Sequence, residues 1–495
     1  MNRRYGVPLF WCLAAAALAL THLPFLSLPF YWDELGQFVP AALDIYHRMA
    51  WVPYSTVPNV HPPGVMAWLA AFWGVFGFSV VRTRIAMLLI AAGALVAAWE
   101  LALELTARKT SAWFAALLLL VSPLFFSQAI LAQLDMPAML LTTAALVLYL
   151  RRRYGMCAAA CCLAVMVKET AIVAPALFGF LLLRRRQTRE ALLFVLPLAP
   201  LLLWLFTLKR QTGHFLGSPN FTDYNLFYPL HPVRLGFALL RRGYYLAIGS
   251  GHIIGTIVLL AVLRKARWSV SDKWKVAGAF AALHTLLISV LGGAVLERYL
   301  LPALPVLYAA FAWAIGQLPQ KPRRLTALAL VACLAIACVR NPPYPFPMEN
   351  NLAWTTFVTL GRDAAQYVQA AIPNARIATS FPMAGALRRP EMGYVSRAFQ
   401  VVEINDFRAQ NLESLDNRAD ALIEYSVIWD PLGILRIPAL TSLLERYYGY
   451  VPQTAPEDVP GLTGMRRSFR TCAAGQCIDV FEKPVTRRPI ESGGR

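Results

Sequence analysis

Long apolar blocks are the feature that most constrains what this chain can fold into. From Pro8 to about Arg340 they recur with roughly 15–22 residues each, near the ~20 residues that an α-helix needs to cross ~30 Å of hydrocarbon. Hydrophobic residues fill 58% of the 495 positions and charged residues 15%, which argues against a soluble globular protein. The blocks stop after Arg340. We therefore predict a polytopic α-helical membrane domain over residues 1–340 and a water-soluble domain over residues 345–495.

The positive charge of the chain is concentrated in short clusters between these blocks. The formal net charge is +19, and "RRRY" at 151, "RRRQTR" at 184, "RKARW" at 264 and "QKPRR" at 319 carry much of it. Lys and Arg in short loops are typical of the cytoplasmic side of a membrane protein. A basic protein can also bind nucleic acid, but this distribution favours membrane topology. We therefore expect no nucleic-acid partner.

The basic clusters also predict the topology. Residues 9–29 form an uncleaved first helix that runs outward, because the apolar core is longer than that of a signal peptide and basic residues precede it. The aromatic segment 65–78 is expected to lie at the interface, since a crossing there would put "RRRY" outside. A short hairpin of 156–167 and 171–183 keeps both flanking Arg clusters in the cytoplasm. The total is about eleven transmembrane helices, with the C-terminal domain outside.

With this topology, many ionisable residues come to the outer ends of helices. A charged side chain in a lipid-facing span costs roughly 2.5–3.5 kcal/mol on insertion scales, so charges at such ends usually face a wet cavity. We expect an outward-facing pocket, with the first acids and interfacial helices in an outer loop over residues 30–83. The residues concerned are Asp33, Glu34, His61, Arg82, Arg84, Asp135, Lys168, Glu169, Glu297 and Arg298.

Four local patterns occur in a recognisable order. They are "YWDELGQF" after the first span, "VHPPGVMAWL" followed by "VRTRIAM", "SPLFFSQAILAQLDMPAMLL", and "VKETAIVAPALF" with the later "ERYLLPALPVLYA". Together they resemble the polyprenyl-phosphate-sugar glycosyltransferases of the GT-C class, which include the protein O-mannosyltransferases and the bacterial lipid A aminoarabinose transferases. The resemblance covers about residues 1–320 and is most specific in the first 185. It implies a GT-C-like fold and a mannosyltransferase-like enzyme that transfers a hexosyl or pentosyl group.

The resemblance also implies roles for particular residues. Asp33 takes the position of the catalytic acid, with Glu34 beside it. His61 takes the basic position of a motif that often has Lys, and a neutral imidazole there weakens the case for a permanent cation. Asp135 matches the Asp-Met-Pro motif and Lys168 the hairpin lysine. Arg298 and Tyr299 match the Arg-Tyr pair before "LLPALP".

The chemistry of glycosyl transfer gives these residues a physical reason. A carboxylate can take the proton from an acceptor hydroxyl, and we assign this role to Asp33, with Glu34 second. Attack opposite the departing phosphate inverts the anomeric centre. The departing phosphate is negatively charged, so cations must bind it. Asp135 and Glu169 are expected to contact the substrate. The expected phosphate-binding residues are His61, Arg82, Arg84, Lys168, Arg298 and Tyr299.

The expected partners follow from the same chemistry. The donor is a polyprenyl-phosphate-linked sugar, the acceptor is a lipid, protein or glycan, and the active site faces the periplasm or exterior from the cytoplasmic (inner) membrane. No cofactor is certain. A divalent metal ion is possible, with Asp33 and Asp135 as candidate ligands, although no ligand spacing decides it.

Each assignment has a structural alternative that the sequence leaves open. Carboxylates can cap or solvate helix ends, and long basic side chains can snorkel at the interface. A transporter or flippase is the main rival function, although no internal repeat supports it. A noncatalytic scaffold that presents the C-terminal domain is the second rival. The residues open to structural roles are Glu34, Arg82, Arg84, Asp135, Lys168 and Glu169.

The C-terminal domain is less informative. "TTFVTLGRDAAQYVQAAI" is amphipathic, and "ARIATSF", "ADALIEYSVIW" and "CIDVFEK" have the pattern of strands, so we predict an extracytoplasmic α/β domain. Cys472 and Cys477 lie in a turn-like segment; they either form a disulfide across a hairpin or remain free thiols. The outer segment 209–243 is expected to be a long loop that serves as a lid or acceptor groove. His252 and His284 are expected to be satisfied within the core.

Overall fold

The chain divides into two compact units in a computed structural model that describes residues 3–267, 269–415, 418–427 and 429–484. The first unit comprises Met1–Ser27, Gln37–Pro342 and Phe346–Trp354. The second comprises Leu28–Gly36, Pro343–Pro345 and Thr355–Arg495. The short segment that carries Asp33 and Glu34 therefore belongs to the same unit as the C-terminal domain.

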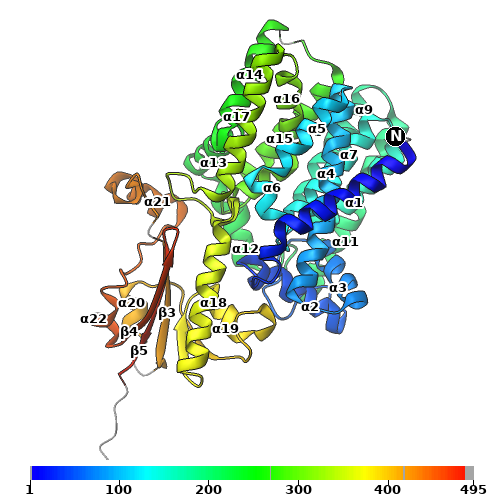
Figure 1. The fold of residues 1–495 in the computed structure, drawn as a ribbon. Helices are drawn as coiled ribbons and strands as arrows, with labels where there is room; N and C mark the ends of the chain where they lie inside the picture. The colour runs from blue at the N-terminus through cyan, green and yellow to red at the C-terminus, as the bar shows by residue number, and fades with distance from the viewer. Residues whose placement is uncertain (1–2, 268, 416–417, 428, 485–495) are drawn as a thin grey trace, which may run out of the picture. The chain divides into compact units, whose positions relative to one another are not determined.

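In its described part the first unit is built of helices and contains no named strand (Figure 1). Its α-helices are α1 (Arg3–His22), α2 (Val39–Arg48), α3 (Gly64–Phe76), α4 (Val80–Thr106), α5 (Lys109–Leu120), α6 (Pro123–Gln128), α7 (Asp135–Leu150), α8 (Tyr154–Val167), α9 (Val173–Arg184), α10 (Thr188–Leu192), α11 (Leu198–Thr212), α12 (Pro219–Thr222), α13 (Pro232–Ala247), α14 (His252–Lys265), α15 (Asp272–Val290), α16 (Leu304–Ile315) and α17 (Gln320–Val339). Short turns of helix join several of them: η1 (Leu23–Phe25), η3 (Glu169–Ile172), η4 (Leu193–Val195), η5 (Asp223–Phe227), η6 (Tyr228–Leu230), η7 (Gly249–Gly251), η8 (Glu297–Ala303) and η9 (Met348–Asn350).

Six helical segments in the described part of the chain are long and apolar enough to cross a membrane, by length and composition. The count of about eleven crossings remains a prediction, because other apolar helices, such as α7 and α8, are shorter. The six segments are Val7–Phe25, Val80–Thr106, Thr188–Thr212, Pro232–Lys265, Glu297–Ile315 and Gln320–Val339.

Helix α4 forms the centre of this unit, where it packs against α1, α7 and α16. Its N-cap is Ser79, whose hydroxyl accepts the backbone N–H of Arg82 at 3.2 Å and satisfies one of the helix's orphan donors. Many of its small apolar residues are fully buried, including Ala91 and Ala94, so neighbouring helices approach closely.

The hairpin predicted between the two Arg clusters is present as α8, η3 and α9. The segment 65–78 forms α3, and its interfacial position remains a prediction. The long loop predicted over 209–243 differs from the structure, because α13 begins at Pro232. Proline suits this first helical position, since it lacks an N–H that the helix would leave unpaired.

The apolar stretch 244–263, one of those expected to cross the membrane, is interrupted. Residues Gly249–Gly251 separate α13 from α14, and Ser250 has a positive φ of 55°. The two histidines expected in the core have partners there. The His252 ring contacts Tyr245 O at 2.7 Å and Tyr308 Oη at 2.9 Å, and His284 Nε2 contacts Tyr299 O at 2.8 Å.

The second unit contains a mixed five-stranded sheet in the order β2-β1-β3-β5-β4 (Figure 1). Its strands are β1 (Arg376–Thr379), β2 (Gln400–Glu403), β3 (Ala421–Val427), β4 (Arg466–Ala473) and β5 (Gln476–Glu482). β1 is parallel to β2 and β3, while β5 is antiparallel to β3 and β4. Its helices are α18 (Ala353–Ala371), whose first two residues are assigned to the first unit, α19 (Met383–Arg388), α20 (Ala409–Glu413), α21 (Pro438–Tyr448) and α22 (Val459–Thr463), with turns η10 (Pro390–Met392) and η12 (Ile434–Arg436).

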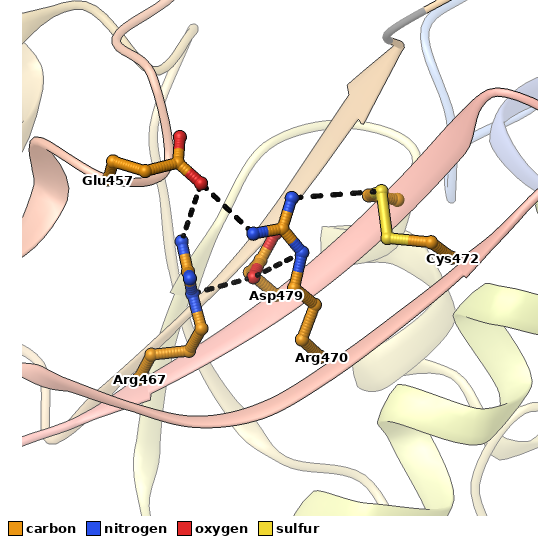
Figure 2. Close-up of a disulfide and its surroundings, with 6 residues drawn as sticks. Glu457, Arg467, Arg470, Cys472 and Asp479 are labelled. Carbon is orange, nitrogen blue, oxygen red and sulfur yellow. Dashed lines mark hydrogen bonds and ion pairs between the residues drawn. A yellow bond between two sulfur atoms is a disulfide. The ribbon is translucent and has the colours of Figure 1, made fainter.

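The α/β character predicted for this region is therefore present, but β2 and β4 were not predicted. β4 carries three arginines and is largely exposed, so it lacks the apolar alternation that marks a strand. A disulfide joins Cys472 to Cys477 across the β4–β5 hairpin. Figure 2 shows the charged groups near it, where Arg467 and Arg470 both contact Glu457 and the buried Asp479.

Candidate functional site

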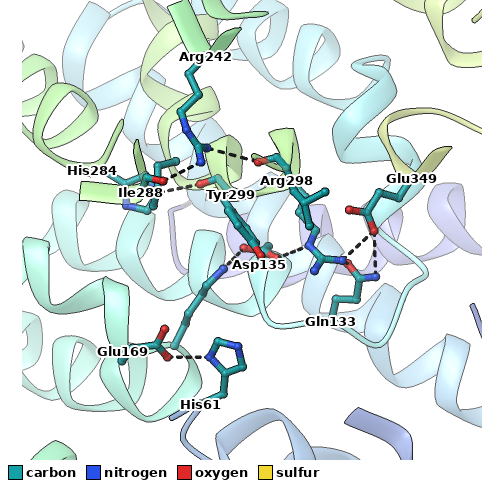
Figure 3. Close-up of polar contacts among 12 residues, drawn as sticks. His61, Gln133, Asp135, Glu169, Arg242, His284, Ile288, Arg298, Tyr299 and Glu349 are labelled. Carbon is teal, nitrogen blue, oxygen red and sulfur yellow. Dashed lines mark hydrogen bonds and ion pairs between the residues drawn. The ribbon is translucent and has the colours of Figure 1, made fainter. Parts of the chain in front are cut away.

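Asp135 is the centre of a buried polar network in the first unit (Figure 3). It is the first residue of α7, and Pro137 follows within the first turn. Proline is tolerated there because the N–H that it lacks would have had no partner within the helix. Its side chain is almost fully buried. Lys168 Nζ lies 2.5 Å from one carboxylate oxygen, and Arg298 Nε lies 3.3 Å from the other. The hairpin turn and η8 thus bring two predicted cations to one predicted acid.

Arg298 connects this acid to residues that were not predicted. Its Nη1 donates to Gln133 Oε1 and to Glu349 Oε2, both at 2.7 Å. Gln133 precedes α7, whereas Glu349 lies in η9, beyond the last apolar block. All these side chains are buried. Ionised groups stay buried only when paired and hydrogen-bonded, so each member depends on the others.

The ring of Tyr299 gathers three cations. Lys168 Nζ lies 4.0 Å from the ring centroid, and the guanidinium carbons of Arg298 and Arg242 lie at 5.5 Å and 5.9 Å. A cation within about 6 Å of an aromatic ring is attracted by its quadrupole. Arg242 is 1% exposed and donates from Nη2 to Ile288 O at 2.7 Å.

We call Asp135, Lys168, Arg242, Arg298, Tyr299 and Glu349 the Tyr299 cluster. It contains three basic side chains and two carboxylates, so its formal charge is +1 (3 − 2). Such a cluster is an unusual feature in an apolar helical unit, and charges there are typically functional. Three cations gathered in one place can meet the negative charge of an anionic ligand.

His61 and Glu169 form a second pair (Figure 3), and Glu169 follows Lys168 directly in the chain. His61 Nδ1 lies 3.0 Å from Glu169 Oε2, and each side chain is about one-fifth exposed, at 18% and 21%. The loop that carries His61 is fixed on both sides. The backbone N–H of His61 donates to Asn59 Oδ1 at 3.0 Å, and Trp204 Nε1 donates to Val60 O at 2.9 Å.

The two predicted arginines of α4 lie in different surroundings. Arg84 is fully buried, donates from Nη1 to Ile130 O at 3.1 Å, and lies 5.5 Å from the Trp354 ring. Those contacts tie α4 to the segments around Ile130 and Trp354. Arg82 is exposed. Their predicted role in phosphate binding remains a prediction.

Asp33 and Glu34 belong to the second unit and differ in their surroundings. Asp33 is half-buried, whereas Glu34 is fully buried. The Glu34 carboxylate accepts the backbone N–H of Tyr31 at 2.9 Å, and the Glu34 N–H donates to Tyr31 O at 2.9 Å. The first of these bonds has the form of the glutamate half of a capping box, and the second is a backbone turn bond. Glu34 therefore closes a turn around Asp33.

The possible metal ion has no preformed ligand group here. Among the described residues, no three His, Cys, Asp or Glu side chains are grouped closely enough to hold a metal. Asp135, one of the two candidates, has its carboxylate engaged by Lys168 and Arg298.

Sequence reasoning missed Gln133, Arg242 and Glu349. A weak signal existed for Arg242, because "LLRRGYYLA" places two arginines inside an otherwise apolar segment. Glu349 stands alone in "PFPMENN", and no local pattern distinguishes it from a loop residue. Its contact with Arg298 depends on tertiary folding.

Comparisons with known proteins agree with the motif resemblance. A family model described as dolichyl-phosphate-mannose-protein mannosyltransferase matches residues 60–208, which contain His61, Asp135, Lys168 and Glu169. No curated protein matches this chain. Two crystal structures of ArnT from Cupriavidus metallidurans are similar at 15% identity over 95% of this chain. The complex with undecaprenyl phosphate has a TM-score of 0.55 over 98% of its length, and the apo form 0.54 over 97%.

These comparisons confirm the resemblance predicted from the motifs and show that the chain has the fold of ArnT, a GT-C glycosyltransferase. With the apolar helices, this fold makes the chain a multi-pass membrane protein.

Proposed function

We propose that this protein transfers a hexosyl or pentosyl group from a polyprenyl-phosphate donor to an acceptor hydroxyl, with inversion, at the outer face of the cytoplasmic membrane. The observation that carries the proposal is the Tyr299 cluster, in which Lys168 and Arg298 converge on Asp135 within an apolar helical unit. Two of these positions, Asp135 and Lys168, lie inside the segment that matches the mannosyltransferase family model.

The cluster supports the role of receiving the departing phosphate. A prenyl phosphate leaves with negative charge, and the cluster has a formal excess of one positive charge. Arg can bind a phosphate through two parallel hydrogen bonds, whereas Lys acts as a compact charge. Asp135 holds both cations in place before the donor arrives, so little reorganisation is needed as charge develops. His61 and Glu169 would bind the donor beside Lys168.

Asp33 would act as the base. Its carboxylate would take the proton from the acceptor hydroxyl while the acceptor oxygen attacks the anomeric carbon and the phosphate departs from the opposite face. Glu34 would serve the turn rather than the reaction, because its carboxylate is occupied by the Tyr31 N–H.

The membrane location suits a donor with a long isoprenoid chain. The chain would remain in lipid while the sugar phosphate reaches the outer aqueous side, and about eleven crossings would place the C-terminal domain there. ArnT, which shares the fold, was crystallised with undecaprenyl phosphate, a lipid of this class.

Transfer by the purified protein in detergent tests the proposal. The donor would be the lipid-linked sugar fraction extracted from native membranes, and the acceptor would be membrane material from a deletion strain. We expect product from the wild-type chain and a loss of at least about 10²-fold for Asp33→Asn. A transporter needs two compartments and yields no new glycosidic bond in detergent, so absence of product from the wild-type chain would refute the enzyme.

A further inference from the structure

The segment that carries the proposed base is part of the C-terminal unit. Both backbone groups of Phe30, its N–H and its C=O, are hydrogen-bonded to the turn around Met392. The Phe30 N–H donates to Met392 O at 3.2 Å, and the Tyr394 hydroxyl donates to Phe30 O at 3.0 Å. Met392 and Tyr394 are both buried. Phe30 precedes Asp33 by three residues, so these bonds fix the entry to the acid-bearing turn.

Aromatic packing fixes the rest of the segment. The Trp32 ring lies edge-on to Phe357 and Phe381, with centroids 5.8 Å and 5.4 Å away. Such edge-to-face pairs contribute beyond their buried area. Trp32 has a positive φ of 40°, a conformation that a residue with a side chain rarely adopts unless its surroundings impose it.

Close contact at Gly36 completes the arrangement. A Cβ at this position would lie 2.5 Å from the Phe381 ring, a distance that real Cβ atoms essentially never show. Only glycine therefore lets the segment approach the ring this closely. Leu35 packs similarly against Gly385, where an added Cβ would lie 2.5 Å from the Leu35 side chain.

We propose that the C-terminal domain positions the catalytic base: the Met392–Tyr394 turn and the Phe381 ring hold residues 30–36 so that the turn closed by Glu34 presents Asp33 in one orientation. The inference rests on the proposed function, because it needs Asp33 to be the base. It gives the domain a role in the rate of the reaction rather than in donor binding. Tyr394 and Phe381 are positioning residues, since they act through the backbone that carries Asp33.

Two single substitutions in the full-length chain test this. Tyr394→Phe removes one hydrogen bond and keeps the ring, while Gly36→Ala forces the segment and the Phe381 ring apart. Misplacement of a reacting group by about 1 Å can lower a rate 10²-fold. We expect both variants to lower the maximal transfer rate at least tenfold, with the half-saturating amount of the extracted lipid-linked sugar fraction unchanged.

Matched substitutions control for general damage. Tyr367→Phe removes a hydroxyl that contacts Glu482 in the same domain, and Gly461→Ala adds a methyl group into open space within the described part of the chain. Both should keep the wild-type rate. Gly36→Ala combined with Phe381→Leu, which makes room for the methyl group, should recover part of the rate that Gly36→Ala loses.

The outcomes separate this inference from the proposed function. If Asp33→Asn abolishes transfer while Tyr394→Phe and Gly36→Ala keep the wild-type rate, the positioning role is wrong and the proposed base stands. If the two variants change the half-saturating amount of the lipid-linked sugar fraction and leave the maximal rate unchanged, the domain serves donor binding and the inference is also wrong. If Asp33→Asn itself retains full transfer, the proposed function fails first.

Discussion

The Lys168 ammonium lies 4.0 Å from the centre of the Tyr299 ring and 2.5 Å from an Asp135 oxygen, so one cation touches both an aromatic face and a carboxylate. Neither partner neutralises it alone, because Asp135 also pairs with Arg298. The Tyr299 cluster thus keeps positive charge available inside an apolar unit. That property connects the packing of the helices to the proposed release of a lipid phosphate.

Removing either member of the Lys168–Asp135 ion pair should destabilise the first unit. Lys168→Met leaves part of the Asp135 carboxylate unpaired, and breaking a buried ion pair in this way costs about 3–5 kcal/mol. Asp135→Asn should be similarly harmful. The double variant should lose less than the sum of the two, because neither the Lys168 ammonium nor the Asp135 carboxylate is left without the other. Thermal unfolding of the detergent-purified chain measures all three, and strictly additive losses would show that the pair is not coupled.

Arg242 should contribute to donor binding although no motif marks it. Arg242→Met removes one of the three cations around Tyr299, which leaves the cluster with no excess positive charge. We expect weaker binding of undecaprenyl phosphate, by about tenfold, and a smaller dependence of that binding on salt. Arg264→Met, at the exposed end of α14, is the matched control and should bind as the wild type does. Equal binding by the two variants would exclude a role for Arg242.

The sequence predicted the elements more completely than the site. The α8–α9 hairpin followed from two Arg clusters about thirty residues apart, because positive charge determines sidedness in short loops. Asp135, Lys168 and Arg298 were predicted through motifs, and the structure brings them together. Glu349 could not be predicted, since its role exists only once η9 folds against Arg298. The assignment of residues 28–36 to the C-terminal unit could not be predicted either, because it depends on contacts with Phe381 and Tyr394 far along the chain.

The C-terminal domain should lose stability as pH rises. Glu424 is buried in β3, and Asp479 lies directly opposite it in β5. Burial, followed by repulsion from Asp479 and Glu457, raises the pKa of Glu424 from 4.5 to about 8. A folded pKa above the unfolded value means that its contribution is complete below pH 4.5 and is lost as pH rises toward 8.

Hydrogen exchange of the β3 and β5 amides in the full-length chain measures this effect. After correction for intrinsic exchange, protection should fall by a few kcal/mol in free energy between pH 5 and pH 8.5, since each pKa unit corresponds to about 1.4 kcal/mol. Glu424→Gln should flatten this dependence and protect the strands better at high pH. A wild-type domain with equal protection at both pH values would contradict the raised pKa.

The disulfide should matter for the hairpin and not for transfer. Cys472 and Cys477 are five residues apart, and closing so short a loop restricts the unfolded chain by about 2 kcal/mol. Cys472→Ser with Cys477→Ser should therefore increase exchange in β4 and β5 by a comparable free energy. The transfer rate should not change, because the disulfide joins β4 to β5 beside their turn, whereas residues 30–36 are held by Met392, Tyr394 and Phe381. A large loss of transfer would show that the hairpin serves the reaction.

Substitution of Asp33 tests the central claim most directly. Sugar transfer and undecaprenyl phosphate binding should be measured side by side on the purified full-length wild-type and Asp33→Asn chains. We predict that transfer falls by about 10²–10⁴-fold while lipid binding stays within about twofold of the wild type, since a lost base acts on the chemical step alone. Wild-type transfer by Asp33→Asn would contradict the assignment of Asp33 as the base.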